Sequence, residues 1–456
     1  MKPGQPSIPI PDKFRVGTLA YTRMGLVGAF FWLLWGDFCF TLMETAGPSL
    51  MPLLLREYGA SNREIAIMVT SITSVLNCVI TPIVNVKSDR HRGSRGRRIP
   101  FLLWPTPFIA LFLGAIPFAP EIAGALGKIH LVRVILELSP STPIILVCGL
   151  LITLFQIFNM VMSSVYYTLF KDVVPDAFMG RFLSLFRVFG FLASAVYNYF
   201  IFGLAEHHMR EIFVGISVLY VIGFGLMCWR VREGEYPPPP PLEKGPGMFS
   251  AVRTFFHESF SQPIYLWVYA ARALASAAVL SDVFAIFFTR DELGISLDAQ
   301  GKLNAWLRLG TLPLAYFFGI FIDRWKPQKA IMLATILPVI ANVVCFYLVR
   351  DWNSLVILGV IFSPFTLFYS IALSVWTQHI LPQDRFGQFA AALSLTSAAV
   401  LAVGAPLCGL FFDWIEVYRY TYLWFSAFMF LSFLCLCKVW KYWVRYGGPD
   451  HYCPPL

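Results

Sequence analysis

Six ionisable side chains lie inside long apolar stretches of this 456-residue sequence: Asp37, Glu44, Arg187, Arg272, Asp282 and Arg308. A charge at the middle of a bilayer costs about 2.5–3.5 kcal/mol on insertion scales, so such residues mark functional sites or paired partners. A carboxylate can carry a proton or accept hydrogen bonds from hydroxyl groups, and an Arg can donate several. The chemistry to expect from these residues is therefore the binding of protons or polar solutes.

Two of the acids share one helix face, and two have a basic residue at similar depth. Asp37 and Glu44 are seven residues apart, which is about two helical turns and about 10 Å along the axis. Arg187 matches the depth of Asp37, and Arg308 matches that of Asp282. Each matched pair is either a structural ion pair between packed helices or part of a binding site, and the sequence leaves both interpretations open.

Glu44 differs from Asp37 in having no basic residue at its own depth. Removal from water disfavours a charged carboxylate that has no cationic partner. Glu44 is therefore a candidate to carry a proton, while Asp37 beside Arg187 is expected to stay ionised. Asp282 is a second candidate for proton coupling. The opposite assignment, with Asp37 as proton carrier and Glu44 as ligand, also fits their shared face.

The composition places these residues in a membrane protein. The protein is 57% hydrophobic and 13% charged, whereas soluble domains carry about 25% charged residues. The nine Cys form neither a CxxC motif nor a Cys/His cluster, so we expect no metal site and no cofactor. No nucleophile–base arrangement is evident, so we do not expect an enzyme.

Membrane-spanning helices need about 20 apolar residues each. We expect twelve, at 28–55, 64–86, 99–119, 143–170, 180–204, 211–230, 262–289, 298–322, 328–349, 353–380, 386–412 and 418–440. Lys and Arg concentrate before the first span and in alternate loops, such as 87–98. Because cytoplasmic loops carry the excess of Lys and Arg, we expect a multi-pass protein of the cell membrane with both termini in the cytoplasm. Twelve spans also exclude nucleic-acid binding as the role of the basic loop.

The sequence divides at a Pro-rich linker. Five consecutive Pro at 237–241 favour extended polyproline II. We expect a six-helix bundle at 1–230, a cytoplasmic linker at 231–261 and a second six-helix bundle at 262–456.

The two halves carry matching motifs in the same order. "YGAS" (58–61) resembles "LGIS" (293–296), Asp89-Arg90 matches Asp323-Arg324, and "VPDAFMGRF" (174–182) matches "LPQDRFGQF" (381–389). Repeated halves with a site between them are typical of transporters. The expected fold is an all-α membrane protein with twelve transmembrane helices in two pseudo-symmetric halves.

The loop "SDRHRGSRGRR" (88–98) resembles the signature loop of the major facilitator superfamily. Its continuation "GRRIPFLL" and the first-span motif "WGDFCFTLMETAGPSLMPLLLREYGAS" are similar to a narrower group. That group comprises the glycoside–pentoside–hexuronide:cation symporters and the sucrose:proton symporters.

This resemblance implies a conformational latch in the basic loop. Asp89 would cap the N-terminus of a neighbouring helix, and Gly96 and Arg97 would complete the latch. A carboxylate stabilises a helix N-terminus, and Arg pairs with carboxylates through two hydrogen bonds. The alternative is that the loop serves only to orient the protein in the membrane.

The resemblance also implies a sugar site. In melibiose carriers an Asp of the first span binds sugar, and an Arg of the fifth span lies beside it; "WGDFCF" and "SLFRVFG" place Asp37 and Arg187 in these positions. Further candidate substrate ligands are Asn159, Ser163, Tyr166 and Trp376.

The sequence departs from the resemblance at two places. The second span lacks the paired Asp residues of sodium-coupled relatives, and the fourth span lacks the sugar-binding acid of that group. We therefore expect H+ rather than Na+ as the coupling ion. The predicted function is proton-coupled symport of a small sugar or glycoside by a monomer. The alternative is an exporter of amphipathic drugs or lipids, which predicts a wider apolar cavity and fewer paired charges.

Overall fold

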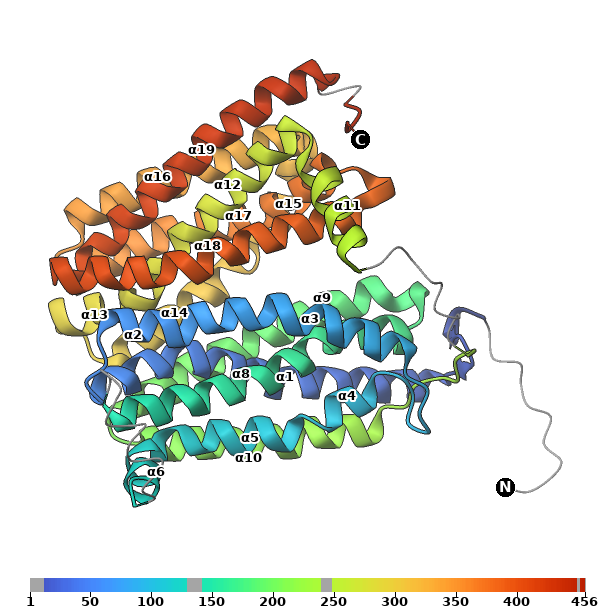
Figure 1. Cartoon of the computed structure of the whole chain (residues 1–456), viewed down its shortest axis with the longest axis horizontal. Helices are drawn as coiled ribbons and strands as arrows, with labels where there is room; N and C mark the ends of the chain where they lie inside the picture. Colours follow the sequence, from blue (N-terminus) through green and yellow to red (C-terminus); the bar gives the residue numbers. More distant parts are fainter. Residues whose placement is uncertain (1–11, 129–141, 239–247, 449–451, 456) are drawn as a thin grey trace. The chain divides into compact units, whose positions relative to one another are not determined.

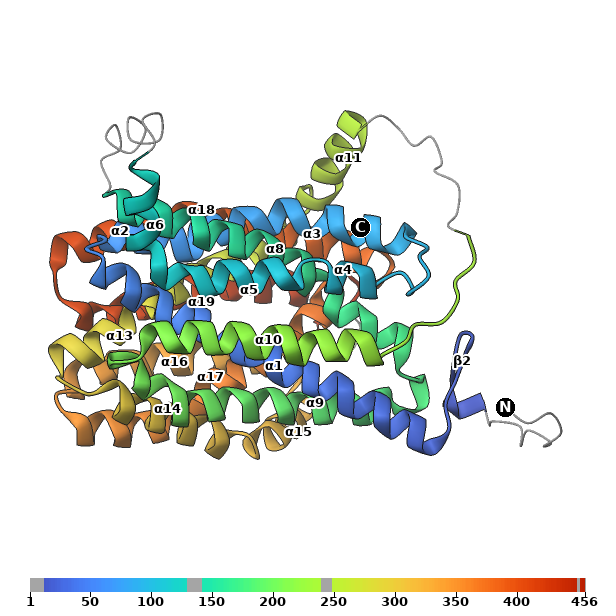
Figure 2. The same ribbon diagram turned by 90° about the horizontal axis from the view of Figure 1, so that it is seen from below.

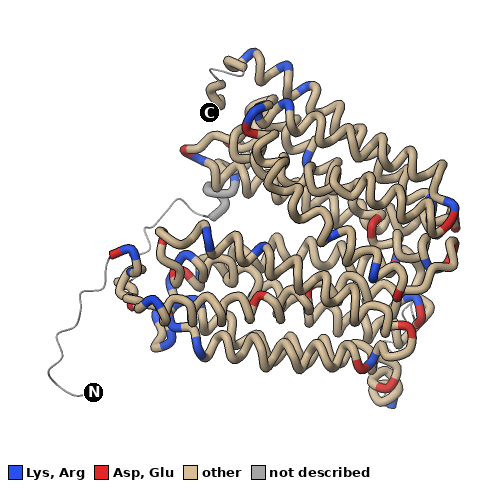
Figure 3. The backbone as a smooth tube through the Cα atoms, turned by 180° about the vertical axis from the view of Figure 1, so that it is seen from behind, with Lys and Arg blue, Asp and Glu red and all other residues tan. Residues whose placement is uncertain are grey.

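The computed structural model describes residues 12–128, 142–238, 248–448 and 452–455, and it is almost entirely α-helical (Figure 1). Within these residues, eleven helices are long and apolar enough to cross a membrane, and one bent helix pair brings the number to twelve. The prediction of an all-α membrane protein with twelve spans is thereby confirmed. Lys and Arg gather towards the ends of the helices, and the middles carry few charges (Figure 3).

The α-helices before the linker are α1 (Arg23–Glu57), α2 (Asn62–Ala66), α3 (Ile72–Arg90), α4 (Ile99–Leu103), α5 (Thr106–Ala115), α6 (Ala119–Leu126), α8 (Pro143–Val173), α9 (Asp176–Val196) and α10 (Met209–Arg230). Those after it are α11 (Met248–Phe260), α12 (Pro263–Val279), α13 (Ala285–Phe287), α14 (Leu297–Thr311), α15 (Leu314–Trp325), α16 (Pro327–Leu348), α17 (Trp352–Ile380), α18 (Phe386–Ile415) and α19 (Thr421–Arg445).

Short 3-10 and π segments join several of these helices. They are η1 (Asp12–Phe14), η2 (Ile67–Ser71), η3 (Ile116–Phe118), η4 (Tyr197–Ile201), η5 (Phe202–Glu206), η6 (Leu280–Phe284), η7 (Phe288–Glu292), η8 (Gln383–Arg385) and η9 (Tyr418–Tyr420). Near the N-terminus, β1 (Arg15–Val16) and β2 (Leu19–Ala20) form an antiparallel hairpin in which Arg15 pairs with Ala20.

The protein forms two compact units. The first contains Met1–Gly47, Val79–Tyr197 and His207–Pro241, and the second contains Pro48–Cys78, Asn198–Glu206 and Leu242–Leu456. In the first unit α5 packs against both α8 and α10 (Figure 2). In the second unit α12 packs against α18 and α19, and α16 packs against α17 and α19. The second unit thus includes parts of α1 and α3 from the first sequence half.

Polar residues that cap helices fix several helix starts. The Thr142 hydroxyl accepts a hydrogen bond from Ile145 N at 3.4 Å, with Pro143 in the first turn of α8. The Asp351 carboxylate accepts one from Ser354 N at 2.9 Å at the start of α17. Caps of this kind satisfy backbone N–H groups that have no partner within the helix.

The internal repeat has a backbone explanation. Gly59 and Gly294 both adopt positive φ, at 83° and 65°, a region that Gly enters without steric cost. Two residues later, Ser61 accepts from Glu64 N at 3.2 Å and Ser296 accepts from Ala299 N at 3.3 Å. "YGAS" and "LGIS" are therefore the same device, a Gly turn followed by a Ser cap, used once in each half.

The eighth span is bent. α14 and α15 meet at an angle of 48° around Leu312 and Pro313. Pro48 and Pro364, by contrast, lie inside the continuous helices α1 and α17. Proline is tolerated in membrane helices where neighbouring groups satisfy the freed backbone.

The linker is ordered at both of its described ends. Residues 231–238 form neither helix nor strand, and α11 begins at Met248; most of the predicted Pro run lies outside the described residues. In the second unit Glu258 of α11 pairs with Arg385 at 3.1 Å, and Tyr269 OH donates to Ser259 O at 3.2 Å. The end of α11 is therefore fixed to the helices that follow it.

Candidate functional site

The first unit brings Asp37 of α1 close to Arg187 of α9, and the two side chains interact electrostatically. Thr41, one turn further along α1, donates to Asp37 Oδ1 at 3.5 Å. Asp37 is 1% exposed, and its Oδ2 is buried and has no hydrogen-bond partner among the described residues. A buried oxygen of this kind is ready to accept a hydrogen bond from a ligand.

Glu44 lies two turns from Asp37 on the same helix and bonds to a different partner. Asn159 of α8 donates from Nδ2 to Glu44 Oε1 at 2.6 Å. Asn159 is 4% exposed, whereas Glu44 retains exposed surface. The structure thus joins Asn159, a predicted substrate ligand, to the predicted proton carrier.

Tyr167 is a tyrosine near these acids that keeps exposed surface. It is 53% exposed and interacts electrostatically with Glu44, Asp37 and Arg187. The predicted ligand Tyr166 is fully buried, and its hydroxyl donates to Leu33 O at 3.2 Å. We therefore leave Tyr166 out of the proposed site and include Tyr167.

Two further predicted ligands have internal partners. The Ser163 hydroxyl donates to Met160 O of its own helix at 3.5 Å. Trp376 is 2% exposed in the core of the second unit, where its Nε1 donates to Gln328 Oε1. A Trp with its polar atom satisfied inside a packed core has no free surface for a substrate, so we also leave Trp376 out of the proposed site.

The second unit does not pair Asp282 with Arg308. Among the described residues no ion pair joins them, and Asp282 instead lies near Cys408. Arg272 has a different partner, the hydroxyl of Tyr369. Asp282 falls in the 3-10 segment η6, where residues advance about 120° each rather than 100°. This change turns its side chain away from the direction that an ideal helix would give.

The basic loop forms an ion-pair network within the first unit. Arg97 donates to Asp172 of α8 twice, with Nε–Oδ2 at 2.9 Å and Nη2–Oδ1 at 2.5 Å. The Asp172 carboxylate raises the pKa of the Arg97 guanidinium through these bonds. Arg98 pairs with both Asp89 and Asp172 and is 5% exposed. The sequence analysis missed Arg98, although its place at the start of an apolar run was the available signal.

Asp89, for which the resemblance implies a capping role, pairs with Arg98. Glu233 caps the start of α4. Its carboxylate accepts hydrogen bonds from the backbone N of Arg97 at 2.9 Å, Arg98 at 2.8 Å and Ile99 at 2.6 Å, at the start of α4. Gly96 adopts a φ of 99°, and a Cβ there would lie 2.5 Å from the Glu233 side chain. The Gly is therefore required both by its backbone and by this contact.

A second carboxylate cap lies within the second unit. Asp413, near the end of α18, accepts from Asn62 N at 2.8 Å and from Arg63 N at 3.0 Å at the start of α2. Tyr418 OH donates to Asn62 Oδ1 at 3.1 Å. Gly409 allows the close approach, because a Cβ there would lie 2.5 Å from Arg63 Cα.

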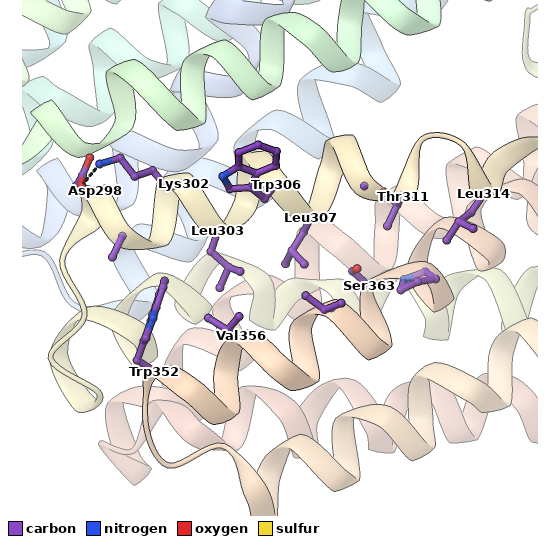
Figure 4. Close-up of a pocket in the computed structure, with 14 residues that line it drawn as sticks. Asp298, Lys302, Leu303, Trp306, Leu307, Thr311, Leu314, Trp352, Val356 and Ser363 are labelled. Atoms are coloured by element: carbon purple, nitrogen blue, oxygen red, sulfur yellow. Dashed lines mark hydrogen bonds and ion pairs between the residues drawn. The ribbon is translucent and has the colours of Figure 1, made fainter.

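A large groove in the second unit is lined by none of the predicted site residues. It has a volume of about 680 Å³ between α14 and α17 (Figure 4). Its walls are mainly apolar, with Leu303, Leu307 and Val356 among them. At one end Lys302 pairs with Asp298 at 2.6 Å. No group of three or more His, Cys, Asp or Glu placed to hold a metal occurs in the described part of the protein.

The comparisons with known proteins show the family and the fold. A family model described as "MFS/sugar transport protein" matches residues 14–417. A search of curated proteins found no match. Solved structures with the same fold include a bacterial homologue of the iron transporter ferroportin, inward-facing, with a TM-score of 0.68 and 15% identity over 91% of this chain and 99% of that one.

Two further structures are similar over nearly their whole length. A bacterial homologue of the human lysosomal transporter Spinster has a TM-score of 0.69 and 11% identity over 95% of this chain and 100% of that one. The nucleoside transporter NupG has a TM-score of 0.65 and 11% identity over 91% of this chain and 99% of that one. At these identities the likeness concerns the fold alone.

Proposed function

The chain belongs to the MFS/sugar transport protein family, and from this premise we propose that it is a proton-coupled symporter of a small sugar or glycoside that works by alternating access. The observation that carries the proposal is the cluster of Asp37, Arg187, Glu44 and Asn159 inside the membrane-spanning part of the first unit. We place the protein in the glycoside–pentoside–hexuronide:cation or sucrose:proton symporter group, on the motifs described above.

Asp37 and Arg187 suit a sugar. The free Oδ2 of Asp37 accepts a hydroxyl hydrogen bond, and Arg187 donates to other hydroxyl oxygens. Tyr167 exposes an aromatic surface beside them. Together these groups offer an acceptor, a donor and a flat apolar surface, which is the combination that a pyranose ring requires.

Glu44 suits the proton. It is the second carboxyl group of the cluster, and its partner is the neutral Asn159. A protonated Glu44 lets the loaded carrier change conformation without an unpaired buried charge, which is costly. Asp282 is a second candidate for the same role. We further propose H+ rather than Na+ as the coupling ion, a monomer in the cell membrane, and cytoplasmic termini.

Uptake into proteoliposomes with a panel of sugars tests this function. We expect an inward proton gradient to drive accumulation of one class of sugar or glycoside, and a protonophore to abolish it. Transport of the sugars that ignores the proton gradient would overturn the coupling, and no transport of any sugar would overturn the substrate class.

The apolar groove supports one alternative, an exporter of amphipathic compounds. A groove of about 680 Å³ with mainly apolar walls and one ion pair suits a ligand with an apolar body and a polar end. The same proteoliposomes, loaded with a fluorescent amphipathic dye, distinguish the two functions.

A further inference from the structure

The amide of Asn159 is bonded at one end only. Its Nδ2 donates to Glu44 Oε1 at 2.6 Å and so connects α8 to α1. Its Oδ1 is buried and has no hydrogen-bond partner among the described residues. Buried polar atoms normally have a partner, so this unpaired oxygen requires an explanation.

The two ends of an amide suit the two protonation states of a carboxyl group. An ionised carboxylate only accepts hydrogen bonds, so it needs the NH₂ of Asn159. A protonated carboxyl group has a hydroxyl that donates, so it needs an acceptor in the same place. A half-turn of the amide about the Cβ–Cγ bond puts Oδ1 of Asn159 where Nδ2 now lies.

Little opposes this half-turn at the far end of the amide. In the observed orientation the far atom is Oδ1, which has no hydrogen-bond partner among the described residues. After the half-turn Nδ2 occupies the same position, where there is no described partner to lose. The contact with Glu44 therefore decides the orientation, whereas an amide bonded at both ends would be held in one orientation.

We propose that Asn159 is a positioning residue whose amide follows the protonation of Glu44: it donates to the ionised carboxylate and, after a half-turn, accepts from the protonated carboxyl group. The proton stays on Glu44, and the amide gains and loses none. The proposal rests on the role of Glu44 given under the proposed function. In this proposal Asn159 is the hydrogen-bond partner of the proton carrier Glu44 and not a sugar ligand.

The other titratable groups around Glu44 come from several helices. Tyr167 of α8 and Tyr220 of α10 interact with it electrostatically. Asp37 of α1 and Arg187 of α9 interact in turn with Tyr167. Among the described residues, Asn159 is the one with a hydrogen bond to the Glu44 carboxyl group, so a change in the protonation of Glu44 acts first on this amide.

Infrared difference spectra between high and low pH test the proposal on the full-length protein in lipid nanodiscs. The probe is the C=O stretching band of the Asn159 amide, marked with isotope-labelled asparagine and identified by its loss in Asn159→Leu. We expect this band to move to lower frequency at low pH, because its oxygen then gains a donor. In Glu44→Gln the band should no longer respond to pH. Asn159→Ala identifies the same band if Asn159→Leu does not fold.

Asn342 provides the matched control, because its amide donates to Pro338 O of its own helix at 2.9 Å and its band should ignore pH. A Glu44 carboxyl band that titrates while the Asn159 band stays fixed overturns the half-turn, and so does the absence of any Glu44 band. If the Asn159 band shifts but Glu44→Gln still accumulates sugar against its gradient, the inference stands and the proton-carrier role fails.

Discussion

Asp37 shows why single polar atoms define the candidate site. Its Oδ1 has Thr41 as a donor, and Arg187 interacts with it electrostatically, yet its Oδ2 is buried without a partner among the described residues. A buried acceptor without a hydrogen bond costs about 1–3 kcal/mol. A substrate hydroxyl that donates to Oδ2 removes this cost, so the free oxygen favours binding of a hydroxylated ligand.

Substitutions of Asp37 and Glu44 should impair transport in different ways. Asp37→Asn should weaken sugar binding about tenfold or more, because a charged acceptor is lost. Glu44→Gln mimics the protonated acid, so it should bind and exchange sugar but lose the uphill accumulation that a pH gradient drives. Sugar binding and pH-driven uptake of both variants in proteoliposomes check this.

Each half of this prediction can fail separately. Unimpaired pH-driven accumulation by Glu44→Gln would remove Glu44 from the coupling role. Unimpaired binding by Asp37→Asn would remove Asp37 from the site. If Asp37→Asn loses coupling and Glu44→Gln loses binding, the two acids have exchanged roles, as their shared helix face allows.

In the first unit, the sequence predicts which charged residues lie together better than it predicts which uncharged residues lie beside them. The proximity of Asp37 and Arg187 follows from equal depth in two spans, because α1 and α9 are regular at these residues. Which of two adjacent tyrosines keeps exposed surface depends on how α8 is rotated in its bundle. Periodicity alone does not give that rotation, so the sequence predicts Tyr166 as a ligand, whereas in the structure Tyr166 is buried and Tyr167 is exposed.

At the scale of helices, carboxylates distant in sequence complete helix starts. Glu233 caps α4 from the beginning of the linker, and Asp413 caps α2 from the end of α18. Each accepts from at least two backbone N–H groups, where a negative charge is also favoured by the helix dipole. Such a cap joins two elements through several hydrogen bonds to one carboxylate, and these bonds are lost together when the elements separate.

Asp413→Asn should loosen the contact between α18 and α2. The amide keeps the shape of the side group but loses the charge and one acceptor, which should cost about 1 kcal/mol, or about fivefold in the equilibrium between closed and open contact. The rate at which a Cys introduced at Ser71 reacts with a maleimide should rise accordingly, because Ser71 lies in η2, which continues directly from α2, and donates to Ala402 O of α18.

Glu416→Gln is the matched control for this variant. It removes the same charge three residues further along, from an exposed position. Equal labelling rates in Asp413→Asn and Glu416→Gln would mean that the cap contributes nothing to the contact.

Breaks in the helices explain why the sequence predicts the spans correctly but not every pairing between them. The break between α14 and α15 contains Pro313, which is a sequence signal for a break. The change from α12 to η6 after Val279 contains no proline and so has no such signal. Asp282 lies beyond that second break. A pairing inferred from ideal helical depth therefore fails for Asp282 and Arg308, although all twelve spans are located correctly.

For the whole molecule, the two sequence halves that carry the repeat do not coincide with the two compact units. The Gly turn and Ser cap recur in both sequence halves, at Ser61 and Ser296. The compact units, however, assign 48–78 to the second unit, because Asp413, Tyr418 and Gly409 hold the start of α2. Sequence symmetry reveals the repeat, but contacts between residues about 350 positions apart have no local signal.

The loop charges predict the orientation of the whole protein. The basic loop is bonded to the start of the linker: Arg92 donates to Pro237 O, and Glu233 accepts from the backbone N of Arg97 and Arg98. The linker must therefore lie on the same side of the membrane as this loop. The positive-inside rule places that side in the cytoplasm. A Cys at Arg232, which is exposed, should therefore resist a membrane-impermeant maleimide in intact cells and react once they are permeabilised.

Asn353→Cys is the control for the opposite side. Asn353 is exposed at the start of α17 and is separated from the linker by an odd number of spans, so a Cys there should react in intact cells. The exposed native Cys453 is replaced by Ser in both variants, because it would otherwise contribute a signal of its own. Labelling of Arg232→Cys from outside would place the basic loop, the linker and the Glu233 cap on the outer face.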